Sequence, residues 1–205
     1  MYFEYGEKEI EYLKSKDKKL GCMIEKIGHI YREVDSDLFS AVVHNIISQQ
    51  ISTKAQLTIW NRMKDNFGDI NFENICNSDI QEIQSFGITF KKAEYIKDFA
   101  LKIKNGELNL KKILKLSDEE AIRELVKLKG IGIWTAEMIL LFCMQRPNIS
   151  SYNDLGIQNG LKIIYHHKEI DKKLFEKYRK RFSPYCSVAS LYLWEVAGNK
   201  ISDNN

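Results

Sequence analysis

The sequence predicts an all-α fold, and two observations support this prediction. Apolar residues recur at steps of three and four along most of the chain, a spacing that gives each helix one apolar face. Clear examples are Leu38, Val42, Val43, Ile46 and Ile47, then Leu57, Trp60, Met63 and Phe67, then Tyr95, Ile96, Phe99 and Ile103. Only two prolines occur in 205 residues, and no run of alternating apolar and polar residues is long enough to predict a sheet.

Residues that typically begin and end helices divide the chain into short helical segments. Two patterns predict capping boxes, Ser78 with Gln81 and Ser117 with Glu120. N-caps are also expected at Ser52 and Thr89, and helix ends at Gly68, Gly87 and Gly106. The connections between helices should therefore be short.

Composition and charge set limits on the class of protein. Hydrophobic residues make up 44% of the chain, enough to bury a core in one domain or in two small lobes. The net charge of +3 permits nucleic-acid binding without arguing for it. The first seven residues do not resemble a secretion signal, and no apolar run reaches the roughly 18 residues that span a bilayer. We expect a soluble cytoplasmic protein with no membrane association.

The cysteines and histidines do not form a metal-binding pattern. The cysteines are far apart, at Cys22, Cys76, Cys143 and Cys186, so neither zinc nor an iron–sulfur cluster is expected. The histidines have no ligand spacing with acids or cysteines, at His29, His44, His166 and His167. We expect reduced thiols and assign the histidines no chemistry.

A Gly-x-Gly turn at Gly130 and Gly132 carries the strongest functional signal. It lies between a charged amphipathic run and an apolar helical run, and it is followed by Trp134. Such a turn exposes backbone N–H groups at the start of a helix, which is an anion-binding geometry. By itself the pattern is equally typical of an ordinary helix start.

Asp154 follows a polar, turn-forming segment that joins two apolar helices, Pro147 to Asn153. We expect this segment to cross between two lobes, which would place the Asp154 carboxylate at the mouth of an interlobe cleft. The alternative interpretation is an N-cap for a helix from Leu155 to Tyr165. Both roles can belong to one residue.

Four motifs in order resemble the helix-hairpin-helix superfamily of DNA base-excision glycosylases, and most of all its 3-methyladenine DNA glycosylase II branch. The motifs are Ile46 to Ser52, Gly87 to Ala93, the hairpin with Asp154, and Leu193-Trp194-Glu195. The resemblance runs from about Ser40 to the C-terminus. The residues before it match nothing specific and are too few for the extra N-terminal domain of some members, so we expect a compact form.

The resemblance implies a catalytic role for Asp154 in cleaving the N-glycosidic bond of a flipped base. Members that also nick the strand carry a lysine two residues after the second hairpin glycine, and here that residue is Trp134. We therefore expect a monofunctional enzyme that leaves an abasic site. No cofactor is expected for catalysis.

The resemblance also implies a base pocket and a residue that fills the gap in the duplex. Trp134 and Trp194 match pocket aromatics, whose indole faces suit a cationic alkylated purine. Met138 stands at a position where related enzymes offer an aromatic, so the pocket could be tuned to another lesion. Gln50 is the expected wedge, with Gln49 contacting the opposite base or serving only as part of a polar turn.

Phosphate and cation contacts complete the set of expected site residues. Phosphate should bind the backbone N–H groups near Gly130, Gly132 and Trp134, with Lys91 and Lys92 near the DNA backbone. By resemblance, backbone carbonyls could hold Na⁺ or K⁺, namely those of Val126, Leu128 and Ile131. Other basic residues are expected to be solvated, namely Lys111, Lys112, Lys115 and the run from Lys172 to Arg181.

The sequence thus predicts two helical lobes. Residues from about 36 to 150 form the lobe with the hairpin, at about 120–145, and residues 1–35 with 151–205 form the other. The expected partner is double-stranded DNA containing a damaged base, and the pocket aromatics implied by the resemblance favour an alkylated purine. Alternatives are an oxidised-purine glycosylase of the 8-oxoguanine type and a non-catalytic DNA-binding module. We expect a monomer, associated with the nucleoid of a bacterial cell when bound to DNA.

Overall fold

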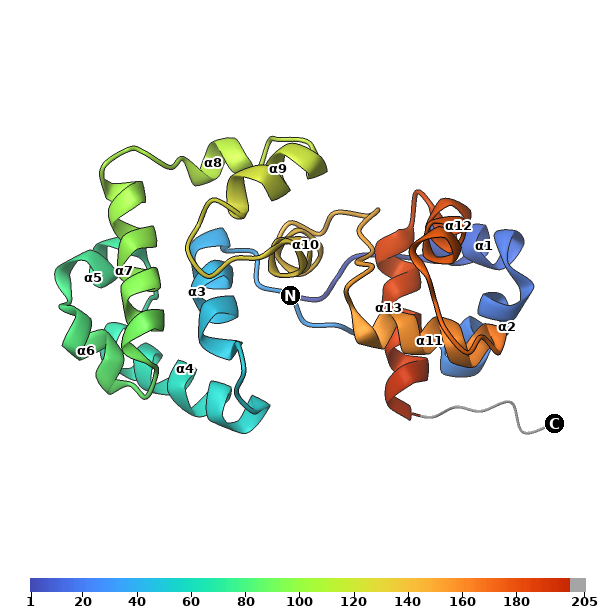
Figure 1. The fold of residues 1–205 in the computed structure, drawn as a ribbon, viewed down its shortest axis with the longest axis horizontal. Helices are drawn as coiled ribbons and strands as arrows, with labels where there is room; N and C mark the ends of the chain where they lie inside the picture. The colour runs from blue at the N-terminus through green and yellow to red at the C-terminus, as the bar shows by residue number, and fades with distance from the viewer. Residues whose placement is uncertain (200–205) are drawn as a thin grey trace. The chain divides into compact units, whose positions relative to one another are not determined.

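The computed structural model describes residues 1–199, which form thirteen helices (Figure 1). Within this range the only extended pairing is an isolated bridge between Tyr2 and Glu33, so the all-α prediction is confirmed. None of the helices in the described range is both long and apolar enough to cross a membrane.

The chain divides into two compact units, and each is described by itself. Unit 1 comprises Met1–Val34 and the chain from Gln145 onward, and unit 2 comprises Asp35–Met144. The helices of unit 1 are α1 (Glu7–Lys16), α2 (Lys18–Ile27), α11 (Leu155–Tyr165), α12 (Lys172–Phe182) and α13 (Cys186–Asn199). The helices of unit 2 are α3 (Leu38–Ser48), α4 (Thr53–Phe67), α5 (Phe72–Asn77), α6 (Ile80–Ser85), α7 (Phe90–Lys104), α8 (Leu110–Ile113), α9 (Asp118–Leu125) and α10 (Ile133–Phe142). In this division the turn from Pro147 to Asn153 belongs to unit 1.

The core of unit 2 forms around α3 and α7. The apolar face of α3 is fully buried at Val42, Val43, Ile46 and Ile47, and Phe39 stacks on Phe99 of α7 with ring centroids 4.9 Å apart. Leu57 of α4 is an exception to the predicted pattern, because its side chain is 52% exposed. The buried face of α4 instead consists of Ile59, Trp60 and Met63.

In unit 1, α11 and α13 pack closely because α11 has a glycine at the contact. A Cβ atom at Gly160 would lie 2.3 Å from the carbonyl oxygen of Leu193, so no larger residue fits without moving the two backbones apart. Tyr192 of α13 is completely buried, and its hydroxyl donates a hydrogen bond to the Gly28 carbonyl over 3.0 Å. This contact joins α13 to the end of α2.

Most predicted helix boundaries are confirmed. Ser117 and Glu120 form the expected capping box, and Ser52 and Thr89 cap α4 and α7. Gly68 ends α4, and Gly87 and Gly106 follow helix ends, all three with positive φ. The box at Ser78 with Gln81 is wrong, since Asp79 caps α6 by accepting a hydrogen bond from the Glu82 N–H over 2.7 Å.

The four cysteines are free thiols. Cys22 is exposed, whereas Cys143 and Cys186 are buried. Burial raises the pKa of Cys143 and of Cys186 to about 12. These two side chains therefore remain protonated at neutral pH and contribute apolar packing.

Candidate functional site

The Gly-x-Gly turn of unit 2 joins α9 to α10. Gly130 has φ +83°, and a Cβ atom there would lie 2.6 Å from the ring of Tyr95, so both conformation and space require glycine. Gly132 is the N-cap residue of α10 in an extended conformation, with open space where a side chain would be. A glycine at this cap has no side chain to cover the first N–H groups of the helix.

The start of α10 is exposed at Ile133 and Trp134, whose side chains are 58% and 43% exposed. Met138 lies one turn further along the helix and is buried. The predicted phosphate site is thus the accessible N-terminus of a ten-residue helix, and Trp134 stands beside it. This geometry suits an anion bound by backbone N–H groups.

The loop between α3 and α4 is tied to the hairpin. Gln49 Nε2 donates a hydrogen bond to the Gly130 carbonyl over 2.7 Å. Lys92 Nζ, on α7, donates to the carbonyls of Ile47 over 2.8 Å and Gln49 over 2.6 Å. Burial lowers the pKa of Lys92. Lys92 and Gln49 thus have partners within the protein.

Gln50 and Lys91 are exposed, unlike the half-buried Gln49 and Lys92. Gln50 is exposed and has φ +58°, in the left-handed region that non-glycine residues seldom adopt. Lys91 is exposed at the start of α7, and its Nζ lies 5.9 Å from the centroid of the Tyr95 ring. Both side chains are on the surface of unit 2.

In unit 1, Asp154 caps α11 and is nearly buried, with 7% of its surface exposed. Its Oδ1 accepts hydrogen bonds from the Ile157 N–H over 2.9 Å and from Trp194 Nε1 over 2.8 Å. The N-cap interpretation is therefore confirmed. A carboxylate held by two donors in a buried position is also oriented for electrostatic chemistry.

Gly156 is a site residue that the sequence reasoning missed. A Cβ atom at this position would lie 2.6 Å from Trp194 Cδ1 and 3.1 Å from Asp154 Oδ1. Glycine therefore allows the indole to reach the carboxylate. The glycine two residues after the capping aspartate is a sequence signal that could have indicated this close approach.

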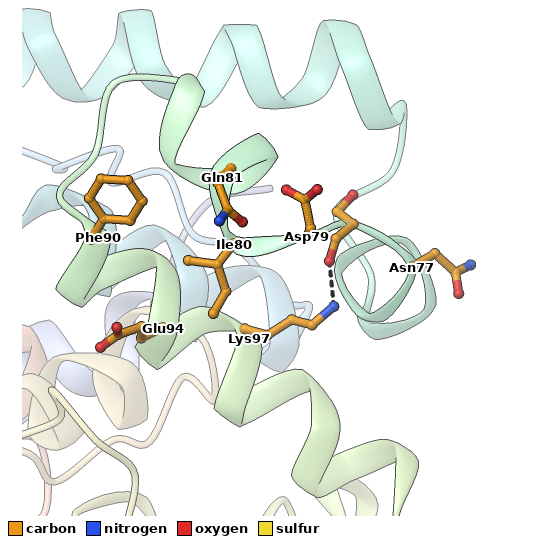
Figure 2. Close-up of a pocket in the computed structure, with 8 residues that line it drawn as sticks. Asn77, Asp79, Ile80, Gln81, Phe90, Glu94 and Lys97 are labelled. Carbon is orange, nitrogen blue, oxygen red and sulfur yellow. Dashed lines mark hydrogen bonds between the residues drawn. The ribbon is translucent and has the colours of Figure 1, made fainter.

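A hollow of about 640 Å³ lies elsewhere in unit 2, where the ends of α5 and α6 meet α7 (Figure 2). Its lining includes Phe90, Glu94 and Lys97, but none of the residues predicted for the site. Lys97 Nζ donates hydrogen bonds to the carbonyls of Ile75, Cys76 and Ser78. The lysine thereby caps the C-terminal end of α5, a structural role.

The remaining basic residues mostly lie in solvent, as predicted. Lys111, Lys112 and Lys115 are exposed, and so are the lysines of α12. Arg181 is the exception in that run, because it donates a hydrogen bond to the buried carboxylate of Asp17, which raises the Arg181 pKa. Arg181 therefore links α12 to the start of α2.

Two histidines have close hydrogen-bonding neighbours among the described residues, and His29 stacks on the ring of Tyr5. His44 Nε2 lies 2.7 Å from Gln56 Nε2, and His167 Nε2 lies 2.7 Å from the Tyr178 hydroxyl. Within residues 1–199, no group of three or more histidine, cysteine, aspartate or glutamate side chains is arranged to hold a metal ion.

Helix α9, the Gly-x-Gly turn and helix α10 together form a helix-hairpin-helix unit, and residues 1–199 are otherwise helical with short connections. Residues 43–184 match the HhH-GPD superfamily of base excision DNA repair proteins, and the chain belongs to this superfamily. The resemblance seen in the sequence is thereby confirmed.

Individual relatives agree with this assignment. YfjP of Bacillus subtilis is 31% identical over 173 residues, which cover 78% of this chain and 59% of YfjP, so the chain spans less than two thirds of that relative. The crystal structure of a DNA-3-methyladenine glycosidase from Bacillus halodurans matches with a TM-score of 0.86 at 31% identity, covering 98% of this chain and 94% of the other. The Schizosaccharomyces pombe 3-methyladenine DNA glycosylase Mag1, solved with abasic DNA, matches with a TM-score of 0.80 at 27% identity, covering 93% and 97%.

Proposed function

We propose that this protein is a monofunctional DNA glycosylase that hydrolyses the N-glycosidic bond of an alkylated purine in duplex DNA. The observation that carries the proposal is the Asp154 carboxylate, buried and held by Ile157 and Trp194. The relatives named DNA-3-methyladenine glycosidase and glycosylase support the substrate class.

The chemistry requires stabilisation of positive charge on the sugar. As the C1′–N bond breaks, its electron pair leaves with the base, and the deoxyribose becomes cation-like. A carboxylate fixed in a buried position opposes this charge more effectively than one in water. The Ile157 and Trp194 donors orient Asp154 before the reaction, so that little rearrangement is needed.

Water completes the reaction. Its oxygen bonds to C1′, and its proton passes to Asp154 or to solvent. A purine that carries a positive charge from alkylation leaves as a neutral base. Because Trp134 occupies the position of the lysine nucleophile in strand-nicking members, no amine is available there to form a Schiff base. The product is an abasic site with an intact strand.

DNA is expected to bind through both backbone and side chains of unit 2. The N–H groups at the start of α10 offer a phosphate site, and Lys91 adds an exposed positive charge. Gln50 is the proposed wedge that fills the space of the flipped base. Trp134, Met138 and Trp194 are the proposed pocket residues, with the indoles stacking on the base.

A monovalent cation at the hairpin is part of the proposal. Backbone carbonyls of Val126, Leu128 and Ile131 are neutral oxygen donors, which suit Na⁺ or K⁺. The Leu128 carbonyl accepts a hydrogen bond from the Ile131 N–H over 3.1 Å, but a carbonyl has two lone pairs, so the donor set fits a cation. The ion would supply positive charge beside a bound phosphate. Monomeric state and action at the nucleoid in the cytoplasm stay predictions.

A panel of duplexes with different lesions tests the proposed function. Each duplex carries one alkylated or oxidised purine, and released bases are identified by mass. Release of alkylated purines is the expected result. Release of 8-oxoguanine alone would favour an oxidised-purine glycosylase, and binding without release from any duplex would favour a non-catalytic DNA-binding module.

A further inference from the structure

We propose that Lys92 and Gln49 are positioning residues that hold Gln50 in place as the wedge, rather than residues that contact DNA. The inference rests on the proposed function, because it takes Gln50 as the wedge. It replaces two expected DNA contacts with a support inside unit 2.

The Lys92 ammonium is committed to the end of α3. Its two hydrogen bonds, to the Ile47 and Gln49 carbonyls, engage oxygens at the C-terminus of α3, where a helix lacks intrahelical donors. A positive charge is also favourable at this end of a helix. Moving Lys92 to a phosphate would leave these carbonyls without their donor, so the same ammonium is poorly placed for both tasks.

The bond to the Gln49 carbonyl acts directly on Gln50. This carbonyl belongs to the peptide group that precedes Gln50, so the hydrogen bond fixes the orientation of the peptide plane on one side of the Gln50 N–Cα bond. That bond has φ +58°, a conformation that side chains other than glycine keep only when their surroundings impose it. Lys92 supplies one such constraint through its hydrogen bond to the Gln49 carbonyl.

Gln49 extends the support to the hairpin. Its side-chain amide donates to the Gly130 carbonyl over 2.7 Å, and the ring of Tyr95 lies where a side chain at Gly130 would be. Lys92 and Tyr95 are three residues apart on α7 and therefore lie on the same face of this helix. Lys92 and Tyr95, on one face of α7, thus contact both the loop that carries Gln50 and the turn at Gly130.

The two roles of Lys92 predict different responses to salt. A lysine that contacts a phosphate contributes about 0.9 to the slope of log affinity against log salt concentration, whereas a positioning residue contributes nothing to that slope. Lys92→Met keeps most of the length of the side chain and removes the charge. Lys91→Met is the matched control on the neighbouring residue.

The test measures affinity for an undamaged duplex and for one with a stable abasic-site analogue over a series of salt concentrations. With Lys92→Met we expect an unchanged salt slope and a loss of preference for the abasic duplex of about tenfold or more. The loss should not add to that of Gln50→Ala, since both changes remove the same wedge. A slope reduced by about 0.9, with equal weakening on both duplexes, would overturn the proposal.

Hydrogen exchange separates this proposal from the proposed function. In the absence of DNA, Lys92→Met should speed exchange of the amides from residue 48 to 52, and Lys91→Met should not. Unchanged exchange would overturn the support by Lys92 whatever the enzyme does. If Lys92→Met fails to fold, Gln49→Ala removes only the bond to Gly130 and should cause the same loss of preference at an unchanged salt slope. If Lys92→Met speeds exchange of these amides as expected but the wild-type protein releases no base, only the proposed function is refuted.

Discussion

Replacing Gly156 with alanine tests whether the hydrogen bond between Trp194 and Asp154 supports base release. The added methyl carbon would lie 2.6 Å from Trp194 Cδ1, whereas carbon atoms in ordinary contact are about 3.5 Å apart or more. The indole must therefore retreat by about 0.9 Å. The bond of 2.8 Å from Nε1 to Oδ1 would then exceed the usual hydrogen-bond range.

The expected loss follows from the type of bond. A hydrogen bond to a charged group contributes about 1.5–3 kcal/mol, which corresponds to a decrease of about 10-fold to 150-fold if the whole contribution is made in the transition state. The measurement is the single-turnover rate of base release from a duplex with one alkylated purine, at saturating protein. We expect binding of an abasic-site duplex to change much less than this rate.

Gly198→Ala is the matched control, because nothing lies within 4 Å of a Cβ atom at that position of α13. It should leave the rate unchanged and should not lower stability, since alanine favours helix more than glycine does. A folded Gly156→Ala protein with the wild-type rate would refute the role given to Trp194.

Three further predictions concern stability and mechanism. Gly160→Ala should lower the free energy of unfolding by about 3 kcal/mol, because its Cβ would lie 2.3 Å from the Leu193 carbonyl oxygen; a urea titration with no shift in midpoint would contradict the packing of α11 on α13. Burial lowers the pKa of His44 from its ordinary value of 6.5, so its stabilising contribution is present above pH 6.5 and is lost as pH falls through the folded-state pKa. The unfolding free energy of His44→Gln should therefore fall less steeply with acidification, and an equal slope would count against this. Borohydride should trap no covalent adduct with a lesion duplex, whereas a strong adduct would reveal an amine nucleophile.

Local signals in the sequence predict most helix boundaries and the N-cap role of Asp154. The helix from Leu155 to Tyr165 has the predicted limits, and Asp154 caps it, because an aspartate cap acts on N–H groups only a few residues away. Ser78 shows the limit of such signals. The sequence predicts Ser78 as an N-cap, but the adjacent residue Asp79 is the N-cap of α6.

Contacts between distant residues could not be predicted in this way. Gln49 and Gly130 are 81 residues apart, and Lys92 is 43 residues from Gln49, so only the packing of α3, α7 and the hairpin brings them together. The same holds for Gly156 against Trp194. The sequence predicts candidate residues near the hairpin, and three-dimensional packing decides which of them face outward and which support their neighbours.

The most direct test of the proposed chemistry is Asp154→Asn. Asparagine can still cap α11 and accept the Trp194 hydrogen bond, so the protein should fold and bind an abasic-site duplex as before. Without the carboxylate, single-turnover release of an alkylated purine should slow by about 100-fold or more. Release at the wild-type rate would contradict the central role of Asp154.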